Sequence, residues 1–177
     1  MSSNNTEVMG LVNKVLGAAD QPVFSVLGTL LQFVSTPEQN RARLSVMLGG
    51  IPARTVVPLH SHADTEIFYL LQGSMEVFQD DGTSSGWQTA KPGDVVTIAG
   101  GVKHALRNQG EIAVSTILVT QEQVHRFFLE LGEQLKPGAS PAAPTPEVMQ
   151  RLFEVAARYG YWLGSPAENA AIGISLG

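Results

Sequence analysis

The feature that most constrains the fold is a run of short apolar segments between residues 41 and 120, separated by turn sequences. Short strands bounded by glycine and proline turns are typical of β-sandwiches and β-barrels. The sequence therefore predicts an all-β core. The expected turns are Gly49-Gly50, Asp80-Asp81-Gly82, Pro92-Gly93-Asp94 and Gly100-Gly101.

Residues 41–48 show the clearest strand pattern. Leu44, Val46 and Leu48 would share one face of the strand, whereas Ser45 and Met47, with Arg43, would share the other. Residues 36–40 are expected to form a turn, and a loop is expected to lead through residues 84–86 to Trp87. Other strands are expected at 24–34 (broken at Gly28), 66–71, 74–79, 95–98, 105–108 and 112–120.

Beyond residue 120 the apolar period becomes helical. Thr120 and Gln123 have capping-box spacing, and a helical stripe follows them. Residues 136–144 predict a linker, and the capping sequence at 145–147 predicts a second helix that ends at Gly160. The stripe consists of Val124, Phe127, Phe128, Leu131 and Leu135.

These patterns predict three regions. An N-terminal extension (1–40) would contribute strands to the barrel and has a partly helical pattern at residues 8–16. The core barrel would occupy 41–120, and C-terminal helices with a tail (121–177) would pack on it. The final residues, 165–177, carry no pattern that we can interpret.

Composition excludes several functions. A net charge of -5 without clustered Lys and Arg argues against nucleic acid as a partner. The absence of cysteine excludes disulfides and thiolate nucleophiles. The apolar segment at 23–34 is too short to span a bilayer, so no membrane partner is expected. The first residues lack the basic start of a secretory signal, so a cytoplasmic location is expected.

Two stretches, residues 54–73 and 93–108, carry side chains that can bind a metal. His60 and His62 occupy alternate positions, so a strand would point both imidazoles to one face. Glu66 follows closely, and His104 lies in the later stretch. Two imidazoles and a carboxylate suit a divalent transition metal with open coordination positions. We interpret the two stretches as halves of one metal site.

Both stretches resemble the paired motifs of the cupin superfamily. In the first, four positions are in register and Arg54 stands where the family has glycine; in the second, four more are in register and Ala99 replaces proline. The resemblance implies a jelly-roll (double-stranded β-helix) barrel that holds one divalent transition metal per chain: iron, nickel, manganese, cobalt or zinc. It also implies a homodimer. The positions in register are His60, His62, Glu66 and Gly73, then Gly93, Gly101, His104 and Asn108.

The sequence Ala-Ala-Arg-Tyr-Gly at 156–160 is similar to the tail of single-domain, quercetinase-like cupins. This resemblance implies a dioxygenase that acts on a small chelating aromatic or enolic substrate. Glu66 would be a metal ligand only, or also a base toward the substrate hydroxyl. Two alternatives remain open: a metal-dependent isomerase or hydrolase, and a non-catalytic protein that binds a small ligand.

The remaining side chains have simpler expected roles. His125 is expected to be exposed or to cap a helix, and not to bind the metal. Asp94 and Asn108 are expected at a turn and a strand end, and either Phe68 or Tyr69 must face inward. A set of aromatic residues is expected to pack helices on the barrel, and the C-terminal helix could cover the barrel mouth. This set is Phe127, Phe128, Phe153, Tyr159 and Trp162.

Overall fold

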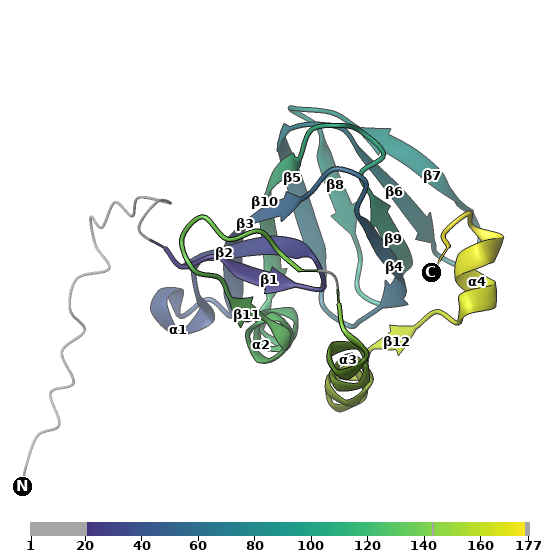
Figure 1. The fold of residues 1–177 in the computed structure, drawn as a ribbon. Coiled ribbons are helices and arrows are strands. Elements are labelled where there is room, and N and C mark those ends of the chain that lie inside the picture. Colours follow the sequence, from purple (N-terminus) through teal and green to yellow (C-terminus); the bar gives the residue numbers. More distant parts are fainter. Residues whose placement is uncertain (1–20, 143, 176–177) are drawn as a thin grey trace, which may run out of the picture.

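The computed structural model describes residues 21–142 and 144–175. Two antiparallel sheets face each other, and helices lie at one end and one side of them (Figure 1). The first sheet contains β1 (Phe24–Val26), β2 (Thr29–Ser35), β3 (Leu44–Ile51), β5 (Glu66–Gln72), β8 (Val95–Ile98), β10 (Val114–Gln121) and β11 (Glu133–Gln134). The second contains β4 (Val56–Ser61), β6 (Met75–Asp80), β7 (Ser85–Ala90), β9 (Lys103–Arg107) and β12 (Trp162–Leu163). The helices are α1 (Pro37–Asn40), α2 (Glu122–Leu131), α3 (Pro146–Arg158) and α4 (Pro166–Ala171).

The strand order is β11-β1-β2-β3-β10-β5-β8 in one sheet and β12-β4-β9-β6-β7 in the other. Inward-facing residues of both sheets form the core, in which Met47, Leu70, Met75 and Val114 are fully buried. The predicted all-β jelly-roll barrel is therefore confirmed. The break at Gly28 is also confirmed, because it separates β1 from β2.

The predicted turn at Gly49-Gly50 was wrong, because both glycines lie inside β3. Gly49 pairs with Leu31 on one side and Thr116 on the other. A Cβ atom at Gly49 would lie 2.8 Å from the Thr116 hydroxyl oxygen. Glycine is needed here for close packing between strands and does not reverse the chain.

Two other segments differ from the prediction. Residues 36–40 form the single-turn helix α1 instead of a simple turn, because the Thr36 hydroxyl accepts a hydrogen bond from the Gln39 amide. The loop expected before Trp87 is strand β7, which pairs with β6 in the register Phe78 opposite Trp87. A polar strand of this kind lacks the apolar alternation on which the prediction relied.

The start of α2 is capped from another part of the chain. The Asp64 carboxylate accepts hydrogen bonds from the backbone amides of Gln123 (2.8 Å) and Val124 (3.0 Å). The predicted capping box at Thr120 was wrong, since its hydroxyl donates to the Thr65 carbonyl. The helix also ends at Leu131, before the predicted end of its stripe. Asp64 thus attaches α2 to the segment between β4 and β5.

The C-terminal tail is part of the barrel. Strand β12 pairs with β4, and the buried Asn169 side chain in α4 accepts a hydrogen bond from the Leu59 amide at 2.8 Å. Helix α4 begins with a capping box formed by Ser165 and Glu168, a signal that the sequence analysis missed. Helix α3 begins after the predicted Thr145 cap. The tail therefore completes the second sheet.

Two expectations remain, one on residues 8–16 and one on membrane spans. The helical pattern at residues 8–16 lies outside the described residues. None of the helices within 21–142 and 144–175 is long and apolar enough to cross a membrane.

Candidate metal centre

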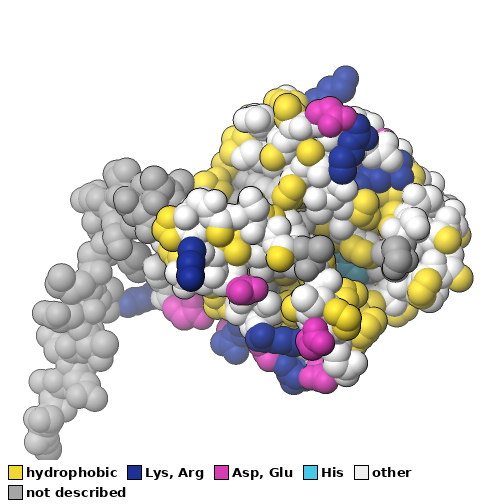
Figure 2. Space-filling model, viewed as in Figure 1, with side chains coloured by type: hydrophobic (Ala, Val, Ile, Leu, Met, Phe, Trp, Pro, Cys, Tyr) yellow, Lys and Arg dark blue, Asp and Glu magenta, His cyan; other side chains and the backbone are white. Residues whose placement is uncertain are grey.

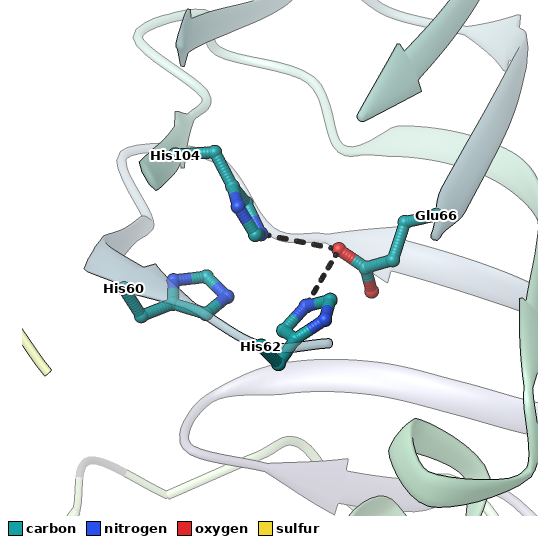
Figure 3. A group of neighbouring side chains, drawn as sticks. All are labelled: His60, His62, Glu66 and His104. Carbon is teal, nitrogen blue, oxygen red and sulfur yellow. Dashed lines mark ion pairs between the residues drawn. The ribbon is translucent and has the colours of Figure 1, made fainter. Parts of the chain in front are cut away.

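Four side chains from three strands and one connection converge inside the barrel (Figure 3). His60 lies in β4 opposite His104 in β9, His62 follows the end of β4, and Glu66 begins β5. One potential ligand atom from each residue lies within 4.8 Å of all the others. Three of the four residues are buried, and His60 is half-buried. The structure therefore brings together all four residues that the motif resemblance singled out.

Backbone carbonyls fix the orientation of all three imidazoles. In each ring Nδ1 lies within hydrogen-bond distance of a carbonyl oxygen, which can only accept, so Nδ1 carries the hydrogen. Each Nε2 is then left with its lone pair, as a metal ligand requires. The acceptors for His60, His62 and His104 are the carbonyls of Pro58 (2.8 Å), Asp64 (2.9 Å) and Val102 (2.9 Å).

The Glu66 carboxylate faces two of these lone pairs. Its Oε2 atom lies 3.4 Å from Nε2 of His62 and 3.3 Å from Nε2 of His104. Burial, and then the neighbouring His104, lower the pKa of His60 to about 3. His60 is therefore neutral at neutral pH, and the Glu66 carboxylate faces the two other imidazoles.

This donor set fits a divalent cation. Nε2 of His104 is buried and has no hydrogen-bond partner within the part of the chain that the structure describes. A carboxylate oxygen and imidazole lone pairs facing one another repel unless a positive charge lies between them. Three imidazoles and one carboxylate are ligands that zinc and other divalent transition metals accept, with positions left open for water or substrate. His60, His62, Glu66 and His104 are therefore the residues that could hold an ion.

A cavity of about 840 Å³ leads to this group. His60, His62 and Glu66 line its inner part, whereas Met149 and Phe153 line it where they are exposed on the surface. Figure 2 shows a histidine side chain in a hollow bordered by hydrophobic side chains. The wall between these ends is mainly apolar. It includes Leu31, Ile51, Phe68, Leu118, Phe127 and Leu152.

Tyr161 lines the same cavity and was missed by the sequence analysis. Its ring stacks on Phe127 with centroids 4.1 Å apart, and its centroid lies 4.8 Å from that of His62. Burial, with the negative charges of Glu66 and Asp64, raises the pKa of Tyr161 well above its usual value. No local signal indicated this residue, because its place depends on the pairing of β12 with β4.

The expectation for His125 was wrong in one respect. This side chain is 1% exposed, and its Nδ1 lies 2.8 Å from the Ser45 hydroxyl. Its ring packs edge-on against Phe33. His125 lies outside the four-residue group. The expectation failed because the start of α2 faces β3 and not the solvent.

Several expected supporting roles are confirmed. The buried Asn108 amide nitrogen lies within hydrogen-bond distance of the Ile51 and Pro52 carbonyls at the end of β3 and of the Ile112 carbonyl before β10. The Asp94 carboxylate accepts from the Lys91 amide in the turn before β8. Phe68 faces the cavity and Tyr69 faces outward.

The expected aromatic packing holds only in part. Phe127 is buried, but Phe153 is 56% exposed at the cavity edge. Trp162 lies under the Lys103 ammonium, which is 4.1 Å from its ring centroid. Helix α3 instead buries Leu152 and Val155.

The chain is similar to one protein family and to several solved structures. Residues 47–120 match the cupin domain family. A variant of Bacillus subtilis oxalate decarboxylase is 21% identical (TM-score 0.53) over 63% of this chain and 30% of that one. A predicted oxalate decarboxylase from Thermotoga maritima is 20% identical (TM-score 0.51), covering 61% of this chain and 98% of that one. A polyketide cyclase from Streptomyces resistomycificus is 14% identical (TM-score 0.55), covering 78% and 92%.

The domain match and the similar structures support the cupin superfamily, and the fold is the cupin jelly roll. This chain spans less than a third of the Bacillus subtilis enzyme's length. No curated protein matches the sequence. At these identities the similar structures define the fold alone.

Proposed function

We propose that this protein is a metal-dependent cupin oxygenase, similar to quercetinase-type dioxygenases, that acts on a small chelating aromatic or enolic substrate. The observation that carries the proposal is the position of the His/Glu group. Three imidazole lone pairs and one carboxylate converge at the inner end of a mainly apolar cavity. Such a site can bind the oxygen atoms of a substrate at one end and cover its apolar body at the other.

The residues assigned to the metal are His60, His62, Glu66 and His104. A bound divalent ion would supply Lewis acidity toward a substrate oxygen and, if it is redox-active, a site for dioxygen. The carbonyl bonds to Nδ1 hold the rings in the ligating orientation, so little rearrangement is needed to load the ion. The apolar walls exclude water from the substrate.

Glu66 is proposed to have a second role beside ligation. Its Oε2 atom faces His62 and His104, so its other oxygen is left to accept the proton of a substrate hydroxyl. Glu66 bound to a cation would be a weak base. It would therefore act on a hydroxyl that is already acidic, such as that of an enol or a phenol.

Oxygen uptake tests this function. Protein loaded separately with iron, nickel, manganese, cobalt or zinc would be given a flavonol and a β-diketone, and dissolved oxygen would be followed with an electrode. We expect oxygen consumption that requires both metal and substrate. His104→Ala serves as the matched variant, because it lacks one ligand.

Other outcomes would reject the oxygenase assignment. Conversion of a substrate without oxygen consumption would favour isomerase or hydrolase chemistry. Ligand binding without turnover under any of the metals would favour a non-catalytic binding protein.

We also propose that the chain forms a homodimer through the outer face of the larger sheet. Ile67, Tyr69 and Leu71 of β5 and Val95 of β8 expose apolar side chains on this face, at 38%, 43%, 44% and 61%. Apolar patches of this kind are typical of interaction surfaces. Sedimentation of the parent and of Tyr69→Lys tests the proposal: a monomeric parent would reject it, and a dimeric parent made monomeric by the substitution would support it.

A further inference from the structure

Tyr161 occupies a position that the tail creates beside the metal group. Gly160 ends α3 in a left-handed conformation (φ 68°), and the Tyr161 amide donates to the Ala156 carbonyl at 2.9 Å. The chain then enters β12, where Trp162 lies opposite Ser61 of β4. This register places Tyr161 next to His62, although 99 positions separate the two residues in the sequence.

The Tyr161 ring packs among other rings of the cavity. It stacks on Phe127 at an interplanar angle of 13°, with centroids 4.1 Å apart. It also lies parallel to the His60 ring (interplanar angle 2°, centroids 6.3 Å apart). A phenylalanine would make these same ring contacts, so packing alone does not require a hydroxyl.

The hydroxyl is buried and has no hydrogen-bond partner among the described residues. A buried, unpaired hydroxyl destabilises a protein relative to an apolar group of the same shape. Tyr161 lines the cavity together with His60, His62 and Glu66. The missing partner is therefore expected to come from a molecule that enters this cavity.

We propose that the Tyr161 hydroxyl donates a hydrogen bond to an oxygen atom of the substrate bound beside the His/Glu group. This inference rests on the proposed function, because it assumes an oxygen-bearing ligand at that site. Tyr161 would then be a substrate-binding residue. It would select ligands with an acceptor oxygen next to the oxygen that binds the metal, because a ligand without it would leave the hydroxyl unpaired.

Ligand binding tests this role without measuring turnover. The probe is 3-hydroxyflavone, a planar ligand with adjacent enol and ketone oxygens, titrated optically into metal-loaded full-length protein. Tyr161→Phe keeps the ring and removes the hydroxyl. Tyr159→Phe is the matched control, since that tyrosine also packs against Phe127 but does not line the cavity.

We expect Tyr161→Phe to bind 3-hydroxyflavone about fivefold to tenfold more weakly, the usual effect of one lost neutral hydrogen bond. Metal content should stay unchanged, and Tyr159→Phe should bind like the parent. The melting temperature of metal-free Tyr161→Phe should equal or exceed that of the parent, because the substitution removes an unpaired hydroxyl and no bond.

Three results would overturn the inference. These are parent-like binding by Tyr161→Phe, a parent that carries metal but does not bind the probe, and a clear fall in melting temperature, which would show a structural partner for the hydroxyl. If Tyr161→Phe weakens probe binding but the parent consumes no oxygen, the inference stands and the oxygenase proposal fails.

Discussion

His104 and His125 are both buried imidazoles, and the Nε2 atom of each has no hydrogen-bond partner within residues 21–142 and 144–175, yet their surroundings differ. Nε2 of His104 faces the buried Glu66 carboxylate at 3.3 Å, together with two other imidazoles. The closest acidic group to Nε2 of His125 is Glu38, at 3.9 Å, whose side chain is 65% exposed. Burial of a histidine therefore does not define a metal site, whereas convergence of several lone pairs on one point does.

The two histidines also differ in the hydrogen-bond partner of Nδ1. The partner of His104 is the Val102 carbonyl, which can only accept and so fixes the hydrogen on Nδ1. The partner of His125 is the Ser45 hydroxyl, which can donate or accept. The first imidazole is therefore oriented as a ligand, and the second is a polar contact within the packing between α2 and β3.

The largest predicted effect is the acid sensitivity of the metal-free protein. His60 takes up a proton near pH 6.5 when unfolded but only near pH 3 when folded. The unfolded state therefore binds more protons between these values, and the free energy of unfolding falls as the pH is lowered, by up to about 5 kcal/mol. Urea unfolding at several pH values between 7.5 and 3 measures this fall in the free energy of unfolding. His60→Gln should show a flatter profile, and a parent without pH dependence in this window would contradict the assignment.

Loss of a ligand should have the next largest effect. Four-ligand zinc sites bind the ion with about 10–16 kcal/mol, so His62→Ala should lose about 3 kcal/mol, roughly a hundredfold in metal affinity. Competition with a chromophoric chelator measures this affinity. Because His62 also contacts Tyr161, the circular dichroism spectrum of the variant must match the parent. Unchanged affinity in a folded variant would remove His62 from the ligand set.

His125→Ala should lower stability and leave metal affinity unchanged, in contrast to His62→Ala. Removing a buried ring that packs on Phe33 and hydrogen-bonds Ser45 leaves a cavity and an unpaired hydroxyl, which should lower the free energy of unfolding by about 2 kcal/mol. Metal affinity should stay at the parent value. Chemical denaturation and the same chelator competition measure the two quantities. A loss of metal affinity by this variant would break the distinction between the two histidines.

Ser45→Ala should have the smallest effect. The substitution removes one hydrogen bond to His125 and very little volume, so the free energy of unfolding should fall by about 1 kcal/mol. Chemical denaturation beside His125→Ala shows whether the two residues act as a pair. If the double variant is destabilised by the full sum of both single effects, the Ser45–His125 bond is not a significant contact.

The sequence predicts the barrel and the metal group for a physical reason. His60 lies in β4 and His62 lies two residues later, just past the end of this strand, and the β4–β9 pairing brings His104 opposite His60. The alternation of side chains along a strand and the spacing of the motif residues in the sequence correspond directly to these positions in the barrel. Gly49 misled the prediction because glycine permits both a turn and a close strand contact, and only the neighbouring Thr116 distinguishes them.

Tyr161 and the cap of α2 could not be predicted in this way. Tyr161 reaches the metal group only because β12 joins β4, and the two-residue strand β12 has no periodicity of its own. Asp64 caps a helix that begins 58 positions later in the chain. Contacts of this kind depend on tertiary packing, which local patterns do not encode.

Metal content per chain tests directly whether His60, His62, Glu66 and His104 hold one metal ion. The parent, His104→Ala and His125→Ala would each be incubated with iron(II), nickel, manganese, cobalt or zinc, desalted, and measured by elemental analysis. We expect about one equivalent in the parent and in His125→Ala, and almost none in His104→Ala. A parent that stays empty with every metal, or a His104→Ala protein that retains a full equivalent, would contradict this expectation.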